Sequence, residues 1–318
     1  MQNTLITSHL AKHLAQLLPK KTMDNRGYEI NEASSYAIFP PGKLFRPNLA
    51  FNLFKDCAGI KDYKKIPKWF YYFTSFLETH HVYTLIHDDL PCMDDDDERR
   101  GKPSLHKAYG EWQALLTGDA LLSLSYELLT HIPGTKNIPL LPFCLRQLGP
   151  RGLIYGQVLD LNNFALKGIA QTLYLHELKT SRLIQVSLIG AWMLGKCEQD
   201  NQNIFYHSKY KKLWRLGKSL GITFQLLDDL SEIWEGQFDG REMTISPWKN
   251  FYTETARELS LHLSTIQQTL DELEYEQTRQ FIFAYLNKCD QNFLKNKAIL
   301  LATFNSWKVF DGAAALID

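Results

Sequence analysis

The segment FYYFTSFLETHHVYTLIHDD, residues 70–89, decides how this chain folds. It contains neither glycine nor proline, and half of the residues in its first half are aromatic. A stretch of this length without breakers favours a long helix, here rich in aromatic residues. Its last two residues, Asp88 and Asp89, therefore lie at the mouth of an apolar region. The aromatic residues are Phe70, Tyr71, Tyr72, Phe73, Phe76 and Tyr83.

The composition around this segment predicts an all-α fold. The chain has 49 Leu and only 4 Val. Leucine loses little rotamer freedom in a helix, whereas strands rely on β-branched residues. The 18 Gly and 12 Pro cluster between long periodic stretches. The predicted helices are 66–89, 111–130, 138–161, 170–195, 203–234, 249–271 and 274–304.

The domain organisation follows from the absence of internal boundaries in the sequence. A prior of about 150 residues per domain would suggest two domains. However, no Ser/Gly-rich or charged linker divides the chain, and no repeat of fixed period occurs. We therefore expect one thick helical bundle and a single domain over residues 1–318.

Charge, hydropathy and cysteine usage exclude several classes of protein. The 35 basic and 35 acidic residues balance, which argues against a nucleic-acid binder. No apolar run reaches the roughly 18 residues that span a bilayer, and residues 1–21 lack a signal-type hydrophobic region. The five cysteines are odd in number and scattered, as is typical of free thiols in a reducing compartment. The sequence thus predicts a cytoplasmic protein with no membrane insertion.

The most unusual segment is HDDLPCMDDDDERRGKP, residues 87–103, in which most positions from 88 to 98 are acidic. Pro91 breaks the helix and is expected to fold Asp94 back towards Asp88. Clustered carboxylates repel one another unless a cation lies among them. Mg²⁺ takes one or two carboxylates and leaves its other positions to substrate phosphates, which arginine also binds. The plainer alternative is a solvated charged loop.

A second acidic segment, GITFQLLDDLSE, covers residues 221–232. Gln225, Asp228, Asp229 and Glu232 fall at i, i+3, i+4 and i+7, so they share one helical face. Such a stripe on an otherwise apolar helix is costly to bury without a counter-ion. It could also be an exposed stripe. Two Asp-Asp pairs in one helical chain favour a carboxylate–metal site, which helical bundles often build.

Four shorter motifs accompany the acidic segments, in order along the chain. They are GKLFRP at 42–47, GDAL at 118–121, GQVLDL at 156–161, and the pair Lys179-Thr180. With the two aspartate motifs, this set resembles the trans-prenyltransferase (polyprenyl synthetase) family, and within it the bacterial short-chain farnesyl diphosphate synthase type. The resemblance implies a helical bundle of the isoprenoid synthase type with a central active-site cavity.

The resemblance implies roles for individual residues. A cluster of about three Mg²⁺ ions, with Mn²⁺ as an alternative, would be held by aspartates of both motifs. The implied metal ligands are Asp88, Asp94 and Asp228, with Asp89, Asp229 and Glu232 ligating or ordering water. The implied allylic diphosphate site contains Arg99, Lys179 and Gln225, with Gln157 and Thr180 nearby. The implied isopentenyl diphosphate site contains Lys43, Arg46, His81 and Arg100.

The implied reaction is a head-to-tail condensation of isopentenyl diphosphate with dimethylallyl or geranyl diphosphate. Metal ions with Arg and Lys would neutralise the departing diphosphate, and aromatic residues would shield the carbocation from water. Tyr83 and Thr84 lie five and four residues before Asp88. A single aromatic at Tyr83 resembles the pattern of farnesyl synthases and implies a C15 product. The family resemblance also implies a homodimer.

Three departures from the family pattern leave alternatives open. The second motif ends in Glu232 where the family usually has Asp. The segment 234–250 offers only Arg241 and Lys249 where the family is rich in Gly and Lys, and 306–318 lacks a basic tail. The alternatives are a diverged, weakly active or regulatory subunit and a C20 (geranylgeranyl) synthase. A terpene cyclase is disfavoured, because it would not need the second set of cationic side chains.

Overall fold

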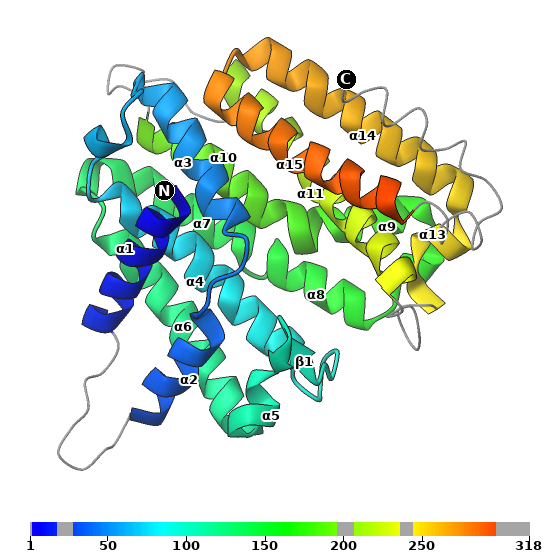
Figure 1. Cartoon of the computed structure of the whole chain (residues 1–318), viewed down its shortest axis with the longest axis horizontal. Coiled ribbons are helices and arrows are strands. Elements are labelled where there is room, and N and C mark those ends of the chain that lie inside the picture. Colours follow the sequence, from blue (N-terminus) through cyan, green and yellow to red (C-terminus); the bar gives the residue numbers. More distant parts are fainter. Residues whose placement is uncertain (1, 18–27, 196–206, 236–243, 297–318) are drawn as a thin grey trace. The chain divides into compact units, whose positions relative to one another are not determined.

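The computed structural model describes residues 2–17, 28–195, 207–235 and 244–296. These parts are helical almost throughout, with one short β-hairpin, so the all-α prediction is confirmed (Figure 1). Contacts within the chain separate two compact units. Unit 1 comprises Met1–Phe51 and Ile60–Pro142, and unit 2 comprises Asn52–Gly59 and Phe143–Asp318. The single domain over 1–318 stays a prediction.

Unit 1 is built around the predicted aromatic helix, α4, which packs against α6. Helices α1 and α2 and the short α5 complete this packing. A hairpin of two strands, with two residues each, ends the acidic segment. The elements are α1 (Gln2–Leu17), α2 (Tyr28–Ile38), α3 (Phe45–Ala58, which continues into unit 2), η1 (Tyr63–Lys65), α4 (Phe70–Asp88), β1 (Glu98–Arg99), β2 (Lys102–Pro103), α5 (Leu105–Tyr109), α6 (Glu111–Thr130) and α7 (Gly134–Leu148, which also continues into unit 2).

The core of unit 1 explains why most residues of α4 are buried. Its residues Val82, Tyr83 and Ile86 join Leu121 and Leu124 of α6 in one buried cluster. Burying an aliphatic or aromatic side chain of this size contributes roughly 1.5–3 kcal/mol. Polar residues of α4 are buried too, and they therefore need partners within the protein.

Unit 2 consists of helices that surround α10 and α11. Helix α11 packs against α10 and α14, and an irregular turn, η3, packs against α8 and α11. The elements are α8 (Leu153–Leu161), η2 (Phe164–Lys167), α9 (Ile169–His176), η3 (Glu177–Ser181), α10 (Arg182–Gly195), α11 (Ser208–Glu235), α13 (Pro247–Asn250), α14 (Tyr252–Leu273) and α15 (Glu276–Lys295).

Three of the predicted helices are divided in the structure, and one of them, 170–195, comprises α9, η3 and α10. The predicted helix 138–161 ends as α7 and restarts as α8, because Gly149 and Gly152 separate them. Gly152 has φ −137° and ψ −114°, outside the helical region, and a Cβ there would overlap the carbonyl oxygen of Gln147. The predicted helix 249–271 is likewise divided at Phe251, which has an extended φ of −141°.

The other predicted helices lie close to their expected bounds, and 111–130 coincides with α6. Parts of two, 203–206 and 297–304, lie outside the described residues, as do Arg241 and the segment 306–318. No helix within the described ranges is long and apolar enough to cross a membrane.

Candidate active site

The first acidic segment begins where α4 ends. The N–H of Asp89 donates to the carbonyl of Leu85 at 3.1 Å, which completes the last helical turn. After Pro91 the chain reverses, and the N–H of Asp94 donates to the carbonyl of Asp88 at 2.9 Å. The predicted return of Asp94 to Asp88 is therefore confirmed at the level of the backbone. The loop places both residues, half-buried, at the carboxyl end of α4.

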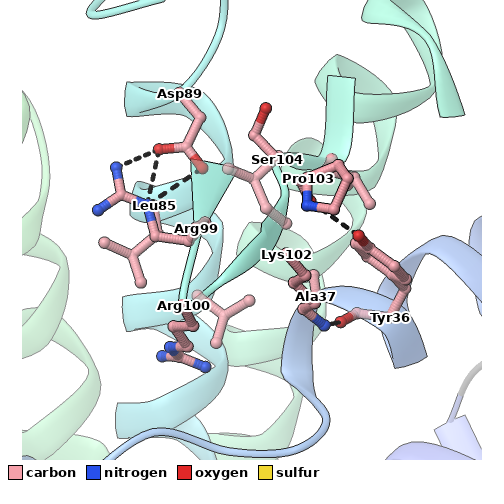
Figure 2. Close-up of a pocket in the computed structure, with 12 residues that line it drawn as sticks. Tyr36, Ala37, Leu85, Asp89, Arg99, Arg100, Lys102, Pro103 and Ser104 are labelled. Carbon is pink, nitrogen blue, oxygen red and sulfur yellow. Dashed lines mark hydrogen bonds and ion pairs between the residues drawn. The ribbon is translucent and has the colours of Figure 1, made fainter. Parts of the chain in front are cut away.

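Arg99, on β1, binds two of the aspartates in this segment. Its Nε donates to Asp89 Oδ1 at 2.9 Å, and its Nη2 also contacts Asp89 (Figure 2). The same Nη2 donates to Asp96 Oδ2 at 2.7 Å. The Asp89 side chain is 4% exposed. Burial raises the pKa of Asp89, and the hydrogen bond and charge of Arg99 oppose that rise. Arg99 thus compensates a buried carboxylate.

The next residue, Arg100, turns to a different part of unit 1. Its guanidinium lies against Gly42, where a Cβ would be 3.1 Å from Cζ, and its Nη2 is 3.9 Å from Glu78 Oε1. Figure 2 shows the two neighbouring arginines pointing to separate places on a small pocket. The walls of that pocket come from α2, α4 and the hairpin. The two adjacent arginines therefore lie in separate surroundings, Arg99 with the first aspartate motif and Arg100 with Gly42 and Glu78.

Glu78 and His81 of α4 lie in the surroundings of Arg100. Burial raises the pKa of Glu78, against the charges of Arg100 and Arg46. Burial, together with the charges of Arg46 and Arg100, holds the pKa of His81 well below its ordinary value. The structure therefore brings three of the four predicted isopentenyl diphosphate residues together, with His81 neutral. Lys43 is exposed, just before the start of α3.

Tyr83 and Thr84, the predicted determinants of product length, have different surroundings. Tyr83 is 4% exposed, and its ring meets His80 edge-on at 4.6 Å and His87 edge-on at 5.7 Å. Burial, and secondarily the charge of Asp88, raise the pKa of Tyr83. Thr84 is half-buried and its hydroxyl donates to the carbonyl of His81 within α4. Of these two residues, Tyr83 is the one whose side chain is buried in the core of unit 1.

The second acidic segment lies on α11 in unit 2. Gln225 Nε2 donates to Asp229 Oδ1 at 2.9 Å, one turn along the helix, as expected for side chains on one face. Gln225 Oε1 accepts a hydrogen bond of 3.0 Å from Thr180. Asp228 is exposed and Glu232 is half-buried. A neutral hydroxyl and a neutral amide thus position the carboxylate of Asp229.

His176 is a neighbour of Asp229 that sequence reasoning missed. Its Nε2 is 3.9 Å from Asp229 Oδ2. Burial lowers the pKa of His176 to about 4, so the imidazole is neutral at physiological pH and adds no charge. Its place at the end of α9, directly before an irregular turn, gave no periodic signal that would have identified it.

Lys179 and Thr180 lie in that turn, η3, which is a π-helix over Glu177–Ser181. Lys179 Nζ forms an ion pair of 2.6 Å with Asp160 Oδ2 on α8. Gly156 makes this approach possible, since a Cβ there would be 2.5 Å from the backbone N of Lys179. Wider turns of this kind occur frequently at functional sites. The turn brings the predicted residues Lys179, Thr180 and Gln225 together with Asp160.

Gln157, also on α8, has an unsatisfied side chain. Both polar atoms of its amide are buried, and neither makes a hydrogen bond within the protein. A buried amide without partners costs roughly 1–3 kcal/mol, so it is suited to a polar ligand. The carboxylates of Asp88, Asp94 and Asp228 offer only oxygen ligands, which Mg²⁺ prefers. Gln157 therefore fits a polar ligand, and the aspartates of each motif, taken by themselves, fit a magnesium ion.

The class of protein follows from these features. An all-α chain with two aspartate motifs, a cationic set at Arg46 and Arg100, and a Lys-Thr pair on a π-turn is typical of prenyltransferases of the isoprenoid synthase type. The sequence profile of the polyprenyl synthetase family matches residues 28–238, and the chain belongs to that family.

Two characterised relatives show the range of the family around this chain. The farnesyl diphosphate synthase of Micrococcus luteus is 33% identical over 224 residues, which cover 68% of this chain and 70% of that protein. The chloroplastic geranylgeranyl pyrophosphate synthase 12 of Arabidopsis thaliana is 33% identical over 216 residues. These cover 65% of this chain and 56% of that protein, so the chain spans little more than half of its plant relative.

A solved structure agrees with the fold. The Helicobacter pylori geranyltransferase complexed with magnesium and isoprenyl diphosphate has a TM-score of 0.71 and 26% identity, and the match covers 91% of this chain and 97% of that one. The fold is therefore that of the isoprenoid synthases, as predicted. The relatives include synthases of both C15 and C20 products, so similarity alone does not decide product length.

Proposed function

We propose that this protein catalyses the Mg²⁺-dependent condensation of isopentenyl diphosphate with an allylic diphosphate to give farnesyl diphosphate. The observation that carries the proposal is the divergence of Arg99 and Arg100. One guanidinium serves the first aspartate motif, and the other lies with Gly42, Glu78 and His81. Two diphosphates need two anion-binding neighbourhoods, whereas a terpene cyclase needs one.

Asp88 and Asp94 in the first motif and Asp228 in the second would hold magnesium, supported by Asp89, Asp229 and Glu232. The metal would supply Lewis-acid stabilisation and orientation of the departing diphosphate. The similar H. pylori geranyltransferase was solved in complex with magnesium, which supports this proposal. The chain itself orients the second motif through Thr180 and Gln225. The number of ions, about three in the family, stays a prediction.

The charged side chains would bind and orient the two substrates. Arg46, Arg100, Lys43 and the neutral His81 would bind isopentenyl diphosphate. Lys179, fixed by Asp160, and Arg99 would bind the allylic diphosphate, whose leaving group gains negative charge as the carbon–oxygen bond ionises. Gln157, with two unsatisfied amide atoms, would also bind a polar group there. No protein base is assigned to the final proton loss, which the departing diphosphate can accept.

We assign the C15 product to Tyr83. Its buried ring meets the rings of His80 and His87 edge-on within α4. We infer that a product longer than C15 would need the space that this ring fills. The plant relatives that make geranylgeranyl diphosphate make a C20 product the alternative. The segment 234–250 has fewer Gly and Lys residues than the family usually has there, so a weakly active or regulatory subunit is the second alternative.

The decisive experiment is product analysis after incubation of the purified protein with Mg²⁺, isopentenyl diphosphate, and dimethylallyl or geranyl diphosphate. We expect farnesyl diphosphate, and loss of turnover on chelation. Tyr83→Ala should shift products to C20 or longer, whereas the control Tyr72→Ala, on the same helix but stacked on His13, should not. A C20 product from the unmutated protein would refute the assignment, and absence of any turnover would favour the regulatory subunit.

The protein is further proposed to be a homodimer. On α6, Trp112, Leu115 and Leu116 are 59%, 46% and 45% exposed. They lie at i, i+3 and i+4, so they form one apolar stripe of the kind that marks interfaces. Light scattering should give twice the 36.8 kDa chain mass, and Leu116→Glu should lower it to one chain. A cytoplasmic location and the absence of nucleic-acid partners stay predictions.

A further inference from the structure

Three side chains that the proposed reaction does not use lie together in unit 1. Asp95 and Asp97 follow the first aspartate motif, and His106 belongs to the first turn of α5. One potential ligand atom from each lies within 4.8 Å of the other two. Among the residues that the structure describes, these three carboxylate and imidazole side chains form a group that could hold a metal ion.

His106 is the residue that makes this group more than an acidic surface. The residue is 6% exposed, and its Nε2 is buried without a hydrogen bond. That atom faces the carboxylates and is 3.9 Å from Asp95 Oδ1. The other ring nitrogen, Nδ1, is 3.1 Å from the hydroxyl of Ser104, which is itself buried. When Nδ1–H donates to that hydroxyl, Nε2 presents its lone pair to the carboxylates.

The backbone holds the two carboxylates in front of this lone pair. Asp95 has a left-handed φ of 56°, and its N–H donates to the carbonyl of Leu90 at 3.2 Å. The carbonyl of Asp97 accepts the N–H of Ser104 at 2.9 Å. Both carboxylates are solvent-accessible, with side chains 59% and 74% exposed, so an ion can reach them. Asp97 currently pairs with Lys107 at 2.7 Å.

We propose that Asp95, Asp97 and His106 form a binding site for a divalent transition metal such as Zn²⁺. Zinc takes imidazole nitrogen and carboxylate oxygen at about 2.0–2.2 Å, which places tetrahedral ligands roughly 3.3–3.5 Å apart. The separation of Nε2 from Asp95 Oδ1 exceeds that by only a few tenths of an ångström. Mg²⁺ prefers oxygen ligands and retains its waters, so His106 selects against it. Ser104 orients the imidazole, as a partner of a metal-binding histidine does.

The site would tie the acidic loop to α5. Asp95 follows Asp94 directly, and Asp96, between the two ligands, already pairs with Arg99. A bound ion would therefore fix Asp95 and Asp97, the two sequence neighbours of Asp96. This inference concerns metal binding to the free protein and does not depend on the proposed reaction.

The test is a titration of the full-length protein with Co²⁺ in a large excess of Mg²⁺, followed by visible absorption. Cobalt reports nitrogen and oxygen coordination directly, and the Mg²⁺ occupies oxygen-only sites. We expect one Co²⁺ per chain, displaced by Zn²⁺. Asp95→Asn and Asp97→Asn should each weaken binding about tenfold or more. Asparagine tolerates the left-handed φ at position 95, so that variant keeps its backbone.

Matched variants make the result specific. Glu98→Gln removes the same charge from the adjacent exposed residue and should leave Co²⁺ affinity unchanged, as should Asp88→Asn. His106→Gln should abolish the absorption bands, and if it fails to fold, the two exposed aspartate variants still decide the matter. The proposal is overturned if no Co²⁺ binds in excess Mg²⁺. It is also overturned if Asp95→Asn and Asp97→Asn bind as tightly as Glu98→Gln.

Discussion

In the first acidic segment Asp89 is buried and accepts hydrogen bonds from the cation Arg99, whereas in the second Asp229 accepts one from the neutral amide of Gln225. The first segment is a loop at the end of a helix, closed by its own backbone between Asp88 and Asp94. The second is an uninterrupted helix whose side chains are spaced by its turns. The two motifs are similar in composition, but a cationic side chain holds the carboxylate in the first and a neutral side chain holds it in the second.

The difference has consequences for electrostatics. A carboxylate held by an arginine depends on the charges of both groups, so its contribution changes with pH and with loss of either partner. The carboxylate of Asp229 accepts from an amide, which in turn accepts from a hydroxyl, and neither of these two groups titrates. Substitution of Arg99, the partner of the first motif, should therefore lower the free energy of unfolding strongly and in a pH-dependent way. Substitution of Thr180, beside the second motif, should lower it weakly and with little dependence on pH.

The largest effect should come from removing a metal-binding carboxylate from either motif. We expect Asp88→Asn and Asp228→Asn each to lower kcat about 100–1,000-fold, since each removes stabilisation of charge that develops in the transition state. Steady-state turnover with dimethylallyl and isopentenyl diphosphates measures this. Asp62→Asn, whose side chain caps η1 and can still do so, is the control. If one of the two variants kept near-normal turnover, the motifs would not be equivalent in catalysis.

The next effect concerns the cationic neighbourhood beside the first motif. Arg46→Ala should raise the KM for isopentenyl diphosphate about 10–100-fold, because it removes one charge-assisted contact worth roughly 1.5–3 kcal/mol. Arg257→Ala, which removes an arginine 74% exposed on α14, should leave both KM values unchanged. A rise confined to the KM for the allylic substrate would reverse the assignment of the two sites.

The third prediction tests the charge dependence of the first motif. Arg99→Gln should lower the free energy of unfolding at neutral pH by about 1–3 kcal/mol, because it leaves the buried Asp89 without its cation. Burial then raises the pKa of Asp89 further, so the folded state of the variant takes up a proton more readily than the unfolded state. The loss should consequently shrink as pH falls through that raised pKa.

Chemical denaturation at a series of pH values measures this effect. Arg279→Gln, which removes a surface partner of the exposed Asp271, is the control and should behave like the unmutated protein at each pH. A loss in Arg99→Gln that stayed constant from neutral to acidic pH would show that packing, and not the charge of Asp89, causes it.

The smallest effect should come from the neutral pair in the second motif. Thr180→Val removes the hydroxyl that donates to Gln225 and should cost about 0.5–1.5 kcal/mol of stability, equally at every pH at which His176 stays neutral. Thr265→Val, whose hydroxyl bonds only to its own helix, is the matched control. A pH-dependent loss in Thr180→Val would contradict the contrast between the two motifs.

The sequence predicts the second motif better than the first. The shared face of Gln225 and Asp229 follows from helical periodicity, which a sequence displays directly. The return of Asp94 to Asp88 was also predictable, because Pro91 cannot continue the helix. The pairing of Arg99 with Asp89 and Asp96 was not. This pairing depends on a hairpin whose two strands have two residues each, which is too short to show the alternation of polar and apolar residues that predicts a strand.

Two missed residues illustrate the same limit in different ways. Glu78 lies three positions before His81 and hence on the same face of α4, so helical spacing could have identified it. His176 could not be found in this way, because the π-turn that follows it changes the direction of every later side chain. The break of the predicted helix 138–161 was signalled by Gly149 and Gly152, but a glycine in a helix is tolerated often enough to be overlooked.

The π-turn at Glu177–Ser181 has a consequence for the length of the chain in this region. A π-turn holds one residue more than an α-helix following the same path, and glycines abut it on two sides. Gly156 of α8 abuts Lys179, and Gly221 of α11 abuts Ser181. Deleting a residue here would yield a more regular helix, yet it would rotate everything beyond by about 100°. Lys179 and Thr180 could then no longer both reach Asp160 and Gln225. Substitutions of side chains around the π-turn should therefore be tolerated better than deletion of one residue from it.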